Sequence, residues 1–179
     1  ICYGGGIFVA VATGGSQAAY STDGINWNSS TLPAITTWTR VRYGNSRFVA
    51  VASSNVKTAY SFDGITWYQS NLTVQGTTLA YGQGVFLVLR NNSSTAYISD
   101  DGANWRVKTV TSQAYASTVF GYNSSDYSGV FVSVGGANIG STISAGIKTK
   151  GRAVITSGTV TSMNLFEPGS GYTSAPSVT

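Results

Sequence analysis

Apolar and aromatic residues fall into short runs along the chain, and turns that contain glycine, serine or asparagine separate these runs. One pattern, an apolar run, a turn and a second apolar run, recurs at residues 3–12, 43–52 and 81–89. Such runs with turn residues between them predict β-strands joined in hairpins. No segment keeps the 3.6-residue apolar period of an amphipathic helix. We therefore expect an all-β protein.

A second shared stretch, Ser-x-Asp-Gly-x-x-Trp, follows each of these hairpins and recurs about every 40 residues, which indicates an array of repeats. Asp-Gly between two apolar runs is a strong hairpin signal, because Gly adopts positive φ and the Asp carboxylate accepts backbone N–H groups. The Trp can lie across the hairpin against a Tyr of the incoming strand. We interpret the stretch as a structural staple. Its members are Ser21, Asp23, Gly24 and Trp27; Ser61, Asp63, Gly64 and Trp67; and Ser99, Asp101, Gly102 and Trp105.

The repeated stretch resembles the Asp-box of sialidase-type β-propellers, in a variant whose Asp and Gly are adjacent. The resemblance implies four-stranded blades with the box on the outer turn of each blade, away from the central site. About 40 residues for four strands agrees with one blade. We expect a partial propeller over residues 1–147, of which the first blade holds only its later three strands. The expected blades span about 1–34, 35–72, 73–110 and 111–147.

The last expected blade is decayed, because its box at residues 143–147 lacks both Asp and Trp. After it, residues 148–179 change to two alternating strands and a Pro-Gly-Ser-Gly turn. This segment resembles a short β module of structural and fibre proteins of tailed bacteriophages, on the residues 168–172 and 175–176. We expect a fibre-like β module here, truncated in mid-strand, and the whole chain to be an excerpt of a longer one.

The composition favours a durable extracellular or virion protein over a cytosolic enzyme, because only 9% of the residues are charged. Ten Lys and Arg against six Asp and Glu give a net charge of +4, but the basic residues are scattered, so we expect no nucleic-acid partner. We also expect no insertion into a membrane, since no apolar run is long enough. Cys2 stands alone, and we interpret it as a buried apolar residue rather than a reactive thiol.

The titratable residues disfavour catalysis. A sialidase-like site would need, by the resemblance, three arginines, a Tyr with a Glu partner and an acidic proton donor. Glycoside hydrolysis usually needs two carboxylates that face one cleft, whereas the acids outside the boxes are Asp100, Asp126 and Glu167. Without His, a Ser-His-Asp triad and a His-containing zinc site are excluded within this chain. We expect no catalytic residue, no cofactor and no metal.

Binding is harder to dismiss, because the chain has 11 Tyr and 4 Trp. Exposed aromatic rings beside Asn and Ser are typical of surfaces that stack on sugar rings. Most of the aromatic residues occupy repeat positions, where packing explains them. The candidates for surface contacts lie outside these positions, although packing stays an alternative for each: Trp38, Tyr68, Tyr115, Tyr122 and Tyr127.

From the two resemblances we expect a non-enzymatic bacteriophage virion protein, a tail-fibre, baseplate or capsid-surface component that serves assembly or host-surface attachment. Its expected location is the extracellular particle. Its expected partners are other virion proteins, copies of itself and a host cell-surface glycan. The alternatives are a secreted carbohydrate-binding propeller and a fragment of a sialidase-type glycosidase. Because so few blades cannot form a usual ring, we expect either further blades before residue 1 or several chains that share one core.

Overall fold

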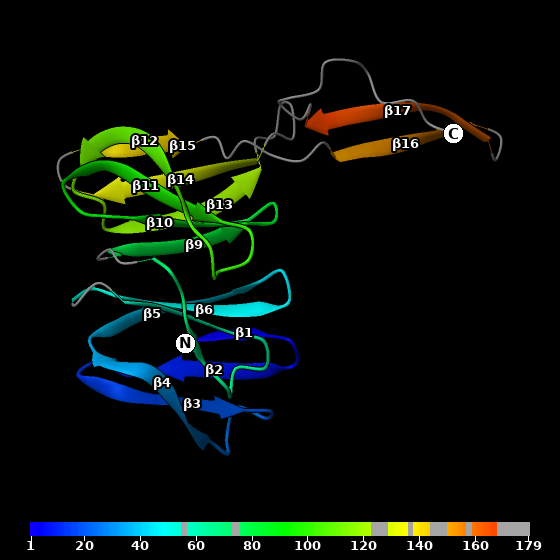
Figure 1. Cartoon of the computed structure of the whole chain (residues 1–179). Coiled ribbons are helices and arrows are strands. Elements are labelled where there is room, and N and C mark those ends of the chain that lie inside the picture. Colours follow the sequence, from blue (N-terminus) through cyan, green and yellow to red (C-terminus); the bar gives the residue numbers. More distant parts are fainter. Residues whose placement is uncertain are drawn as a thin grey trace.

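The chain is all-β in a computed structural model, as the sequence predicts. The structure describes residues 1–54, 57–72, 76–122, 129–135, 138–143, 150–156 and 159–167, with backbone alone at Gln113 and beyond residue 135. Within these ranges there are strands and turns and no helix. Three four-stranded antiparallel sheets, a three-stranded sheet and a C-terminal hairpin follow one another (Figure 1).

Every sheet is a meander, because its strands follow one another in chain order. The first sheet contains β1 (Cys2–Gly4), β2 (Ile7–Val11), β3 (Gly15–Ser21) and β4 (Asn28–Thr36). The second contains β5 (Trp38–Gly44), β6 (Arg47–Ala52), β7 (Thr58–Ser61) and β8 (Tyr68–Gln69). The third contains β9 (Thr78–Gly82), β10 (Val85–Leu89), β11 (Ser93–Ser99) and β12 (Arg106–Gln113).

The fourth sheet contains β13 (Ser117–Tyr122), β14 (Gly129–Gly135) and β15 (Asn138–Ile143). The hairpin consists of β16 (Lys150–Thr156) and β17 (Thr159–Glu167). The first strands of consecutive sheets, β1, β5, β9 and β13, contact one another in that order. Figure 1 shows an open row, with the first sheet at the lower end and the fourth at the upper end.

The first sheet corrects one expectation, because it holds four strands and not three. Cys2, Tyr3 and Gly4 pair with Val9, Phe8 and Ile7 of β2, so that even this short segment forms an edge strand. The ladder occupies the backbone groups of β1 on one side. The division of the chain into a propeller and a separate fibre module stays a prediction.

Among the side chains that the structure describes, the buried apolar residues form three clusters, one between each pair of consecutive sheets from the first to the fourth. β6 contributes to two of them, since Phe48 and Ala50 belong to the first cluster and Val49 and Val51 to the next. A strand that is buried on both faces needs a continuous apolar run, which explains the sequence of β6. Burying each such side chain contributes about 1.5–3 kcal/mol. The stack therefore depends on the contacts between sheets as much as on pairing within them.

One contact recurs at all three of these interfaces and involves the Gly that ends the first strand of each of the first three sheets. A Cβ built on Gly4, Gly44 or Gly82 would lie 2.0, 2.3 or 1.9 Å from a ring carbon of the following sheet. We call this the ring-on-glycine contact. Its three pairs are Tyr43 on Gly4, Tyr81 on Gly44 and Phe120 on Gly82.

A side chain at these glycines is expected to destabilise the stack. Gly44→Ala places a methyl group 2.3 Å from the Tyr81 ring and should lower the free energy of unfolding, by about 1–3 kcal/mol, the usual cost of overpacking. Denaturant unfolding monitored by tryptophan fluorescence measures the change.

The matched control is Gly121→Ala, because a Cβ at Gly121 meets nothing within 4 Å in the described part of the chain. Gly121→Ala should change the free energy of unfolding by no more than about 0.5 kcal/mol. Equal losses for the two variants would contradict the ring-on-glycine contact as the cause.

Candidate functional site

The Ser-x-Asp-Gly-x-x-Trp stretches form the tight turns at residues 21–27, 61–67 and 99–105, here called the box turns. In the first, the N–H groups of Ile25 and Asn26 each donate to Asp23 Oδ1, at 2.8 Å. Ser21 Oγ donates to the same carboxylate oxygen at 2.9 Å and accepts the N–H of Gly24 at 2.9 Å. Gly24 has a φ of 76°, as the turn requires. The expected turn hydrogen bonds are present.

The other two box turns repeat this geometry closely. Asp63 Oδ1 accepts the N–H groups of Ile65 and Thr66 at 2.8 Å each. Asp101 Oδ1 accepts those of Ala103 and Asn104 at 2.9 and 2.7 Å. In each turn, two backbone N–H groups of the same loop therefore donate to one carboxylate oxygen of the Asp.

These hydrogen bonds lower the pKa values of the box carboxyl groups. For Asp23, the Asn26 side chain has the largest effect, followed by backbone N–H groups, and its pKa lies well below the ordinary range. For Asp101, partial burial opposes ionisation, but the bonds from Asn104, Ala103 and Ser99 outweigh it and lower the pKa to about 2. Both groups are ionised acceptors at neutral pH, which does not suit a general acid.

The second and third box turns also pack against the sheet before them. A Cβ at Gly64 would meet Val9 Cγ2 at 2.6 Å, and one at Gly102 would meet Val49 Cγ2 at 2.4 Å. Hydrogen bonds accompany this packing, since Ser30 Oγ donates to the Ile65 carbonyl at 2.6 Å. The box turns thus join neighbouring sheets as well as the strands of one hairpin.

The Trp side chains differ from turn to turn. Trp27 Nε1 donates to the Gly24 carbonyl at 3.2 Å, and Trp105 Nε1 donates to the Gly102 carbonyl at 3.1 Å. Trp67 is 8% exposed, against 40% for Trp27, and its Nε1 is buried with no partner among the described residues. The Trp therefore caps its own turn in two copies and serves mainly as a core residue in the other.

Two of the five candidate contact residues are core residues, so the expectation that they lie on the surface is wrong. Trp38 and Tyr115 are 0% and 1% exposed. The indole N–H of Trp38 donates to the Ala34 carbonyl at 3.0 Å, and the Tyr115 hydroxyl donates to the Thr111 carbonyl. Each ring fills space between sheets while its polar group finds a backbone acceptor.

The remaining candidates are Tyr68 and Tyr122, which are 46% and 58% exposed, and Tyr127, which lies outside the described residues. Tyr68 stacks on Tyr60 with ring centroids 5.5 Å apart and contacts Phe62, which is 57% exposed. The Arg47 guanidinium lies 4.7 Å from the Phe62 ring centroid. We call Arg47, Tyr60, Phe62 and Tyr68 the aromatic cluster.

Sequence reasoning found Tyr68 but missed Phe62, because Phe62 occupies the variable position of the box. The corresponding residues of the other boxes are Thr22 and Asp100. A signal for this site was present, since the second box alone has an aromatic residue at that position and another directly after its Trp. The aromatic cluster is thus specific to the second sheet.

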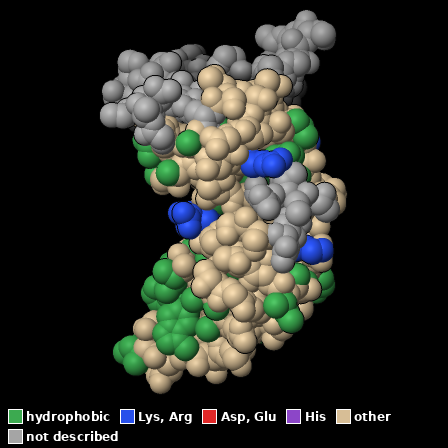
Figure 2. Space-filling model, turned by 90° about the vertical axis from the view of Figure 1, so that its left-hand side faces the viewer, with side chains coloured by type: hydrophobic (Ala, Val, Ile, Leu, Met, Phe, Trp, Pro, Cys, Tyr) green, Lys and Arg blue, Asp and Glu red, His purple; other side chains and the backbone are tan. Residues whose placement is uncertain are grey.

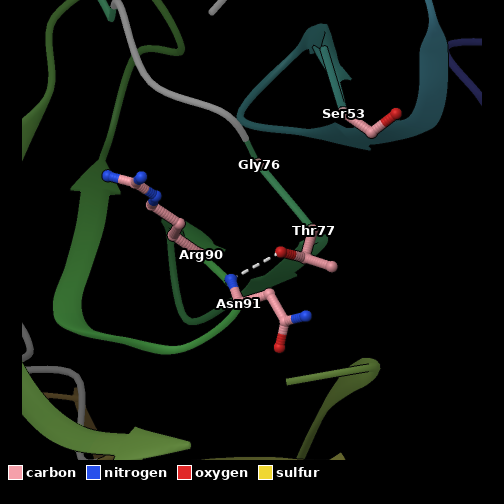
Figure 3. A pocket seen from close by; sticks show the side chains of 5 residues that line it. All are labelled: Ser53, Gly76, Thr77, Arg90 and Asn91. Atoms are coloured by element: carbon pink, nitrogen blue, oxygen red, sulfur yellow. Dashed lines mark hydrogen bonds between the residues drawn. The ribbon is translucent and has the colours of Figure 1, made fainter. Parts of the chain in front are cut away.

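A polar hollow of about 280 Å³ lies at the other ends of the sheets from the box turns. Ser53, Gly76, Thr77, Arg90 and Asn91 line it, and Thr77 Oγ1 accepts the N–H of Asn91 at 2.7 Å. Figure 3 shows the side chains of Arg90 and Asn91 pointing in different directions. The polar groups of the hollow therefore do not converge on one point.

The other acidic residues are not gathered into a site by the described structure. Asp100 forms an exposed ion pair with Arg106 at 3.6 Å, Glu167 lies on β17, and Asp126 is outside the described residues. Among the side chains that the structure describes, no three of His, Cys, Asp and Glu could hold one metal ion. Nor does the described part contain a helix able to cross a membrane.

Burial raises the pKa of the Cys2 thiol to about 11, so that it stays protonated at neutral pH. Cys2 packs against the first inter-sheet cluster, in agreement with its interpretation as an apolar residue.

The fold defines an all-β protein built from stacked four-stranded meanders. Comparison with family models and with curated proteins finds no match.

Loss of one box carboxylate is expected to destabilise its turn. Asp63→Ala removes the acceptor of two backbone N–H groups, and we expect the free energy of unfolding to fall, by about 1–2 kcal/mol. Denaturant titration measures this, with Asp100→Ala at an exposed ion pair as the control. An unchanged stability of Asp63→Ala would show that water replaces the carboxylate without cost.

Stability should also fall in acid. A carboxyl group whose pKa is lowered by folding stabilises the protein fully above its unfolded pKa, near 3.8, and loses this contribution as pH falls through the folded value. Asp101 should therefore lose its stabilising contribution between about pH 4 and about pH 2. Unfolding midpoints measured from pH 6 to pH 2 should show a flatter profile for Asp101→Asn. Parallel profiles would contradict the role of Asp101.

Proposed function

We propose that this chain is a non-enzymatic structural protein of a bacteriophage virion, as a tail-fibre, baseplate or capsid-surface component. The observation that carries the proposal is that the box carboxylates are hydrogen-bonded within their own turns, while the second and third turns also pack on the sheet before them. The repeated motif therefore supports a stiff stack. The virion location rests on the resemblance of residues 148–179 to a phage fibre module and on the low content of charged residues.

We further propose that the sheets are blades of an Asp-box propeller. Three features support this: the four-stranded meanders, the strand order, and a box turn between the third and fourth strands of each of the first three sheets. The first strands lie next to one another, as they do around a propeller axis. The row of sheets is open, so further blades would have to complete a ring.

Purified particles of the phage that encodes the chain test the virion location. Mass spectrometry should recover its peptides in a constant ratio to the major capsid protein through successive purification steps. Recovery only from the culture medium would favour the secreted carbohydrate-binding alternative. Turnover of a sialoside by the purified protein would favour the glycosidase alternative and overturn the proposal.

Within this function, the aromatic cluster supports a contact with a host cell-surface glycan. Phe62 and Tyr68 are 57% and 46% exposed, and their rings meet edge to face with centroids 6.2 Å apart. Exposed rings of this kind can stack on the apolar face of a sugar, and Arg47 can donate hydrogen bonds to its hydroxyl or carboxylate groups. Arg47 also donates a hydrogen bond to the Asp101 carbonyl of the third box turn at 2.7 Å, which holds its guanidinium beside the Phe62 ring.

Removal of the Tyr68 ring is expected to weaken adsorption to host cells. Tyr68→Ser should lower the binding of the purified chain to cells or to their extracted glycans by about tenfold, as for a central aromatic contact residue. The control Tyr3→Ser removes a ring that is 60% exposed and belongs to the first sheet. Equal binding by the two variants at unchanged thermal stability would exclude the aromatic cluster as a glycan contact.

A further inference from the structure

Every box turn contains an Asp-Gly pair, a sequence that is prone to form isoaspartate. In such a pair the Gly nitrogen can attack the Asp Cγ, because Gly has no side chain to shield its nitrogen. A bond forms between this nitrogen and Cγ, the nitrogen loses its proton, and one carboxyl oxygen leaves as water, which gives a cyclic succinimide. Water then opens the ring, mainly to isoaspartate, in which the main chain runs through Cβ and Cγ. The pairs are Asp23-Gly24, Asp63-Gly64 and Asp101-Gly102.

Isoaspartate would damage a box turn in two ways. The Asp63 carboxylate, which accepts the N–H groups of Ile65 and Thr66, would become part of the main chain. The main chain would also gain a carbon next to Gly64, where a Cβ would already meet Val9 Cγ2 at 2.6 Å. The box thus places a reactive sequence where its reaction would disturb both the turn and the packing between sheets.

In each box turn the Ser hydroxyl bonds to both groups that would react. Ser61 Oγ donates to Asp63 Oδ1 at 2.9 Å and accepts the N–H of Gly64 at 2.8 Å. The corresponding distances in the third turn are 3.0 and 2.8 Å. The Ser of every box turn is 0% exposed. One buried hydroxyl therefore bridges the nitrogen that would attack and the carboxyl group that it would attack.

These bonds oppose the reaction at both groups. The Gly nitrogen must give up its proton, whereas its N–H donates to a hydroxyl that is shielded from solvent. The carboxyl group must lose an oxygen as water, for which the neutral acid is the better form. Partial burial favours the neutral acid at Asp101, but hydrogen bonds outweigh it and lower the pKa to about 2, so that the group is ionised at neutral pH. Ring closure would also take Oδ1 away from its two backbone N–H donors.

The box turns lie at the same end of the sheets, because each follows the third strand of its meander. Figure 2 shows the opposite end, where Lys and Arg side chains are visible but no Asp or Glu side chain is. Asp100 lies beside the third pair and is followed by Asp101 rather than by Gly. It therefore provides a reference acid in the same turn.

We propose that the Asp-Gly pairs of the box turns are latent sites of isoaspartate formation, and that the Ser of each box keeps its pair unreactive in the folded chain. The Ser then has a chemical role besides its place in the turn. Loss of its hydroxyl frees the Gly N–H and removes one hydrogen bond from the carboxylate of that turn alone. This inference goes beyond the virion location and does not depend on it, since it concerns the folded turn itself.

The experiment follows isoaspartate in the 179-residue chain at neutral pH, at a temperature below the unfolding transition. Peptide mapping separates the Asp and isoaspartate forms of each box, and labelling with an isoaspartyl methyltransferase counts them. Ser61→Ala should raise the rate at Asp63 by at least about tenfold, because two hydrogen bonds that oppose the reaction are lost. Asp23 and Asp101 of the same molecules should keep their native rates.

The two unaltered turns are internal controls. General loosening of the fold would raise all three rates together, whereas loss of one hydroxyl should raise one rate. Ser99→Ala is the second variant, and it should raise the rate at Asp101 and leave Asp100 and Asp63 unchanged. A peptide of residues 58–69 gives the rate of the unfolded sequence, and the native chain should react at Asp63 at least about tenfold more slowly than this peptide.

Thermal unfolding verifies that each variant is folded. Equal rates at Asp63 in the native chain and the peptide would overturn the proposal, because the folded turn would then give no protection. An unchanged rate at Asp63 in folded Ser61→Ala would exclude the hydroxyl as the cause, and an equal rise at all three turns would assign the effect to general loosening. If Ser61→Ala does not fold, Ser99→Ala applies the same test at Asp101, and the comparison with the peptide needs neither variant.

Discussion

The close packing of each sheet on the one before it is the constraint on which the rest of this structure depends. A four-stranded meander on its own would leave its apolar residues exposed to water, and burying them against another sheet is the main favourable contribution to folding. Here β6 and β10 are buried on both faces, because neighbouring residues of each strand belong to different inter-sheet clusters. These residues are Phe48 and Val49 in β6, and Phe86 and Leu87 in β10. Glycine at positions 4, 44 and 82 permits this approach, because any side chain there would overlap a ring of the next sheet.

The box turns combine two tasks that many proteins assign to separate residues. Their carboxylates satisfy backbone N–H groups within the loop, which preserves the hairpin. The glycines of the second and third turns also lie against the preceding sheet, which preserves the stack. The low pKa of Asp101 follows from the first task and needs no catalytic explanation. A repeated acidic motif can therefore be a packing device, and its recurrence in three sheets supports a scaffold function for the chain.

A surface available to other molecules lies where the repeats differ from one another. The aromatic cluster exists because the second box has Phe62 where the other boxes have Thr22 and Asp100.

The sequence by itself determined the strands, the turns and the bonding of the box carboxylates, because these depend on neighbours within a few residues. Asp23, for example, bonds only to groups between Ser21 and Asn26. The tertiary structure alone decided which aromatic residues are buried. Trp38 and Tyr115 do not follow the repeat, yet they are core residues, whereas Tyr3 follows it and is exposed. Burial depends on whether another sheet covers the residue, and that cover comes from residues distant in the sequence.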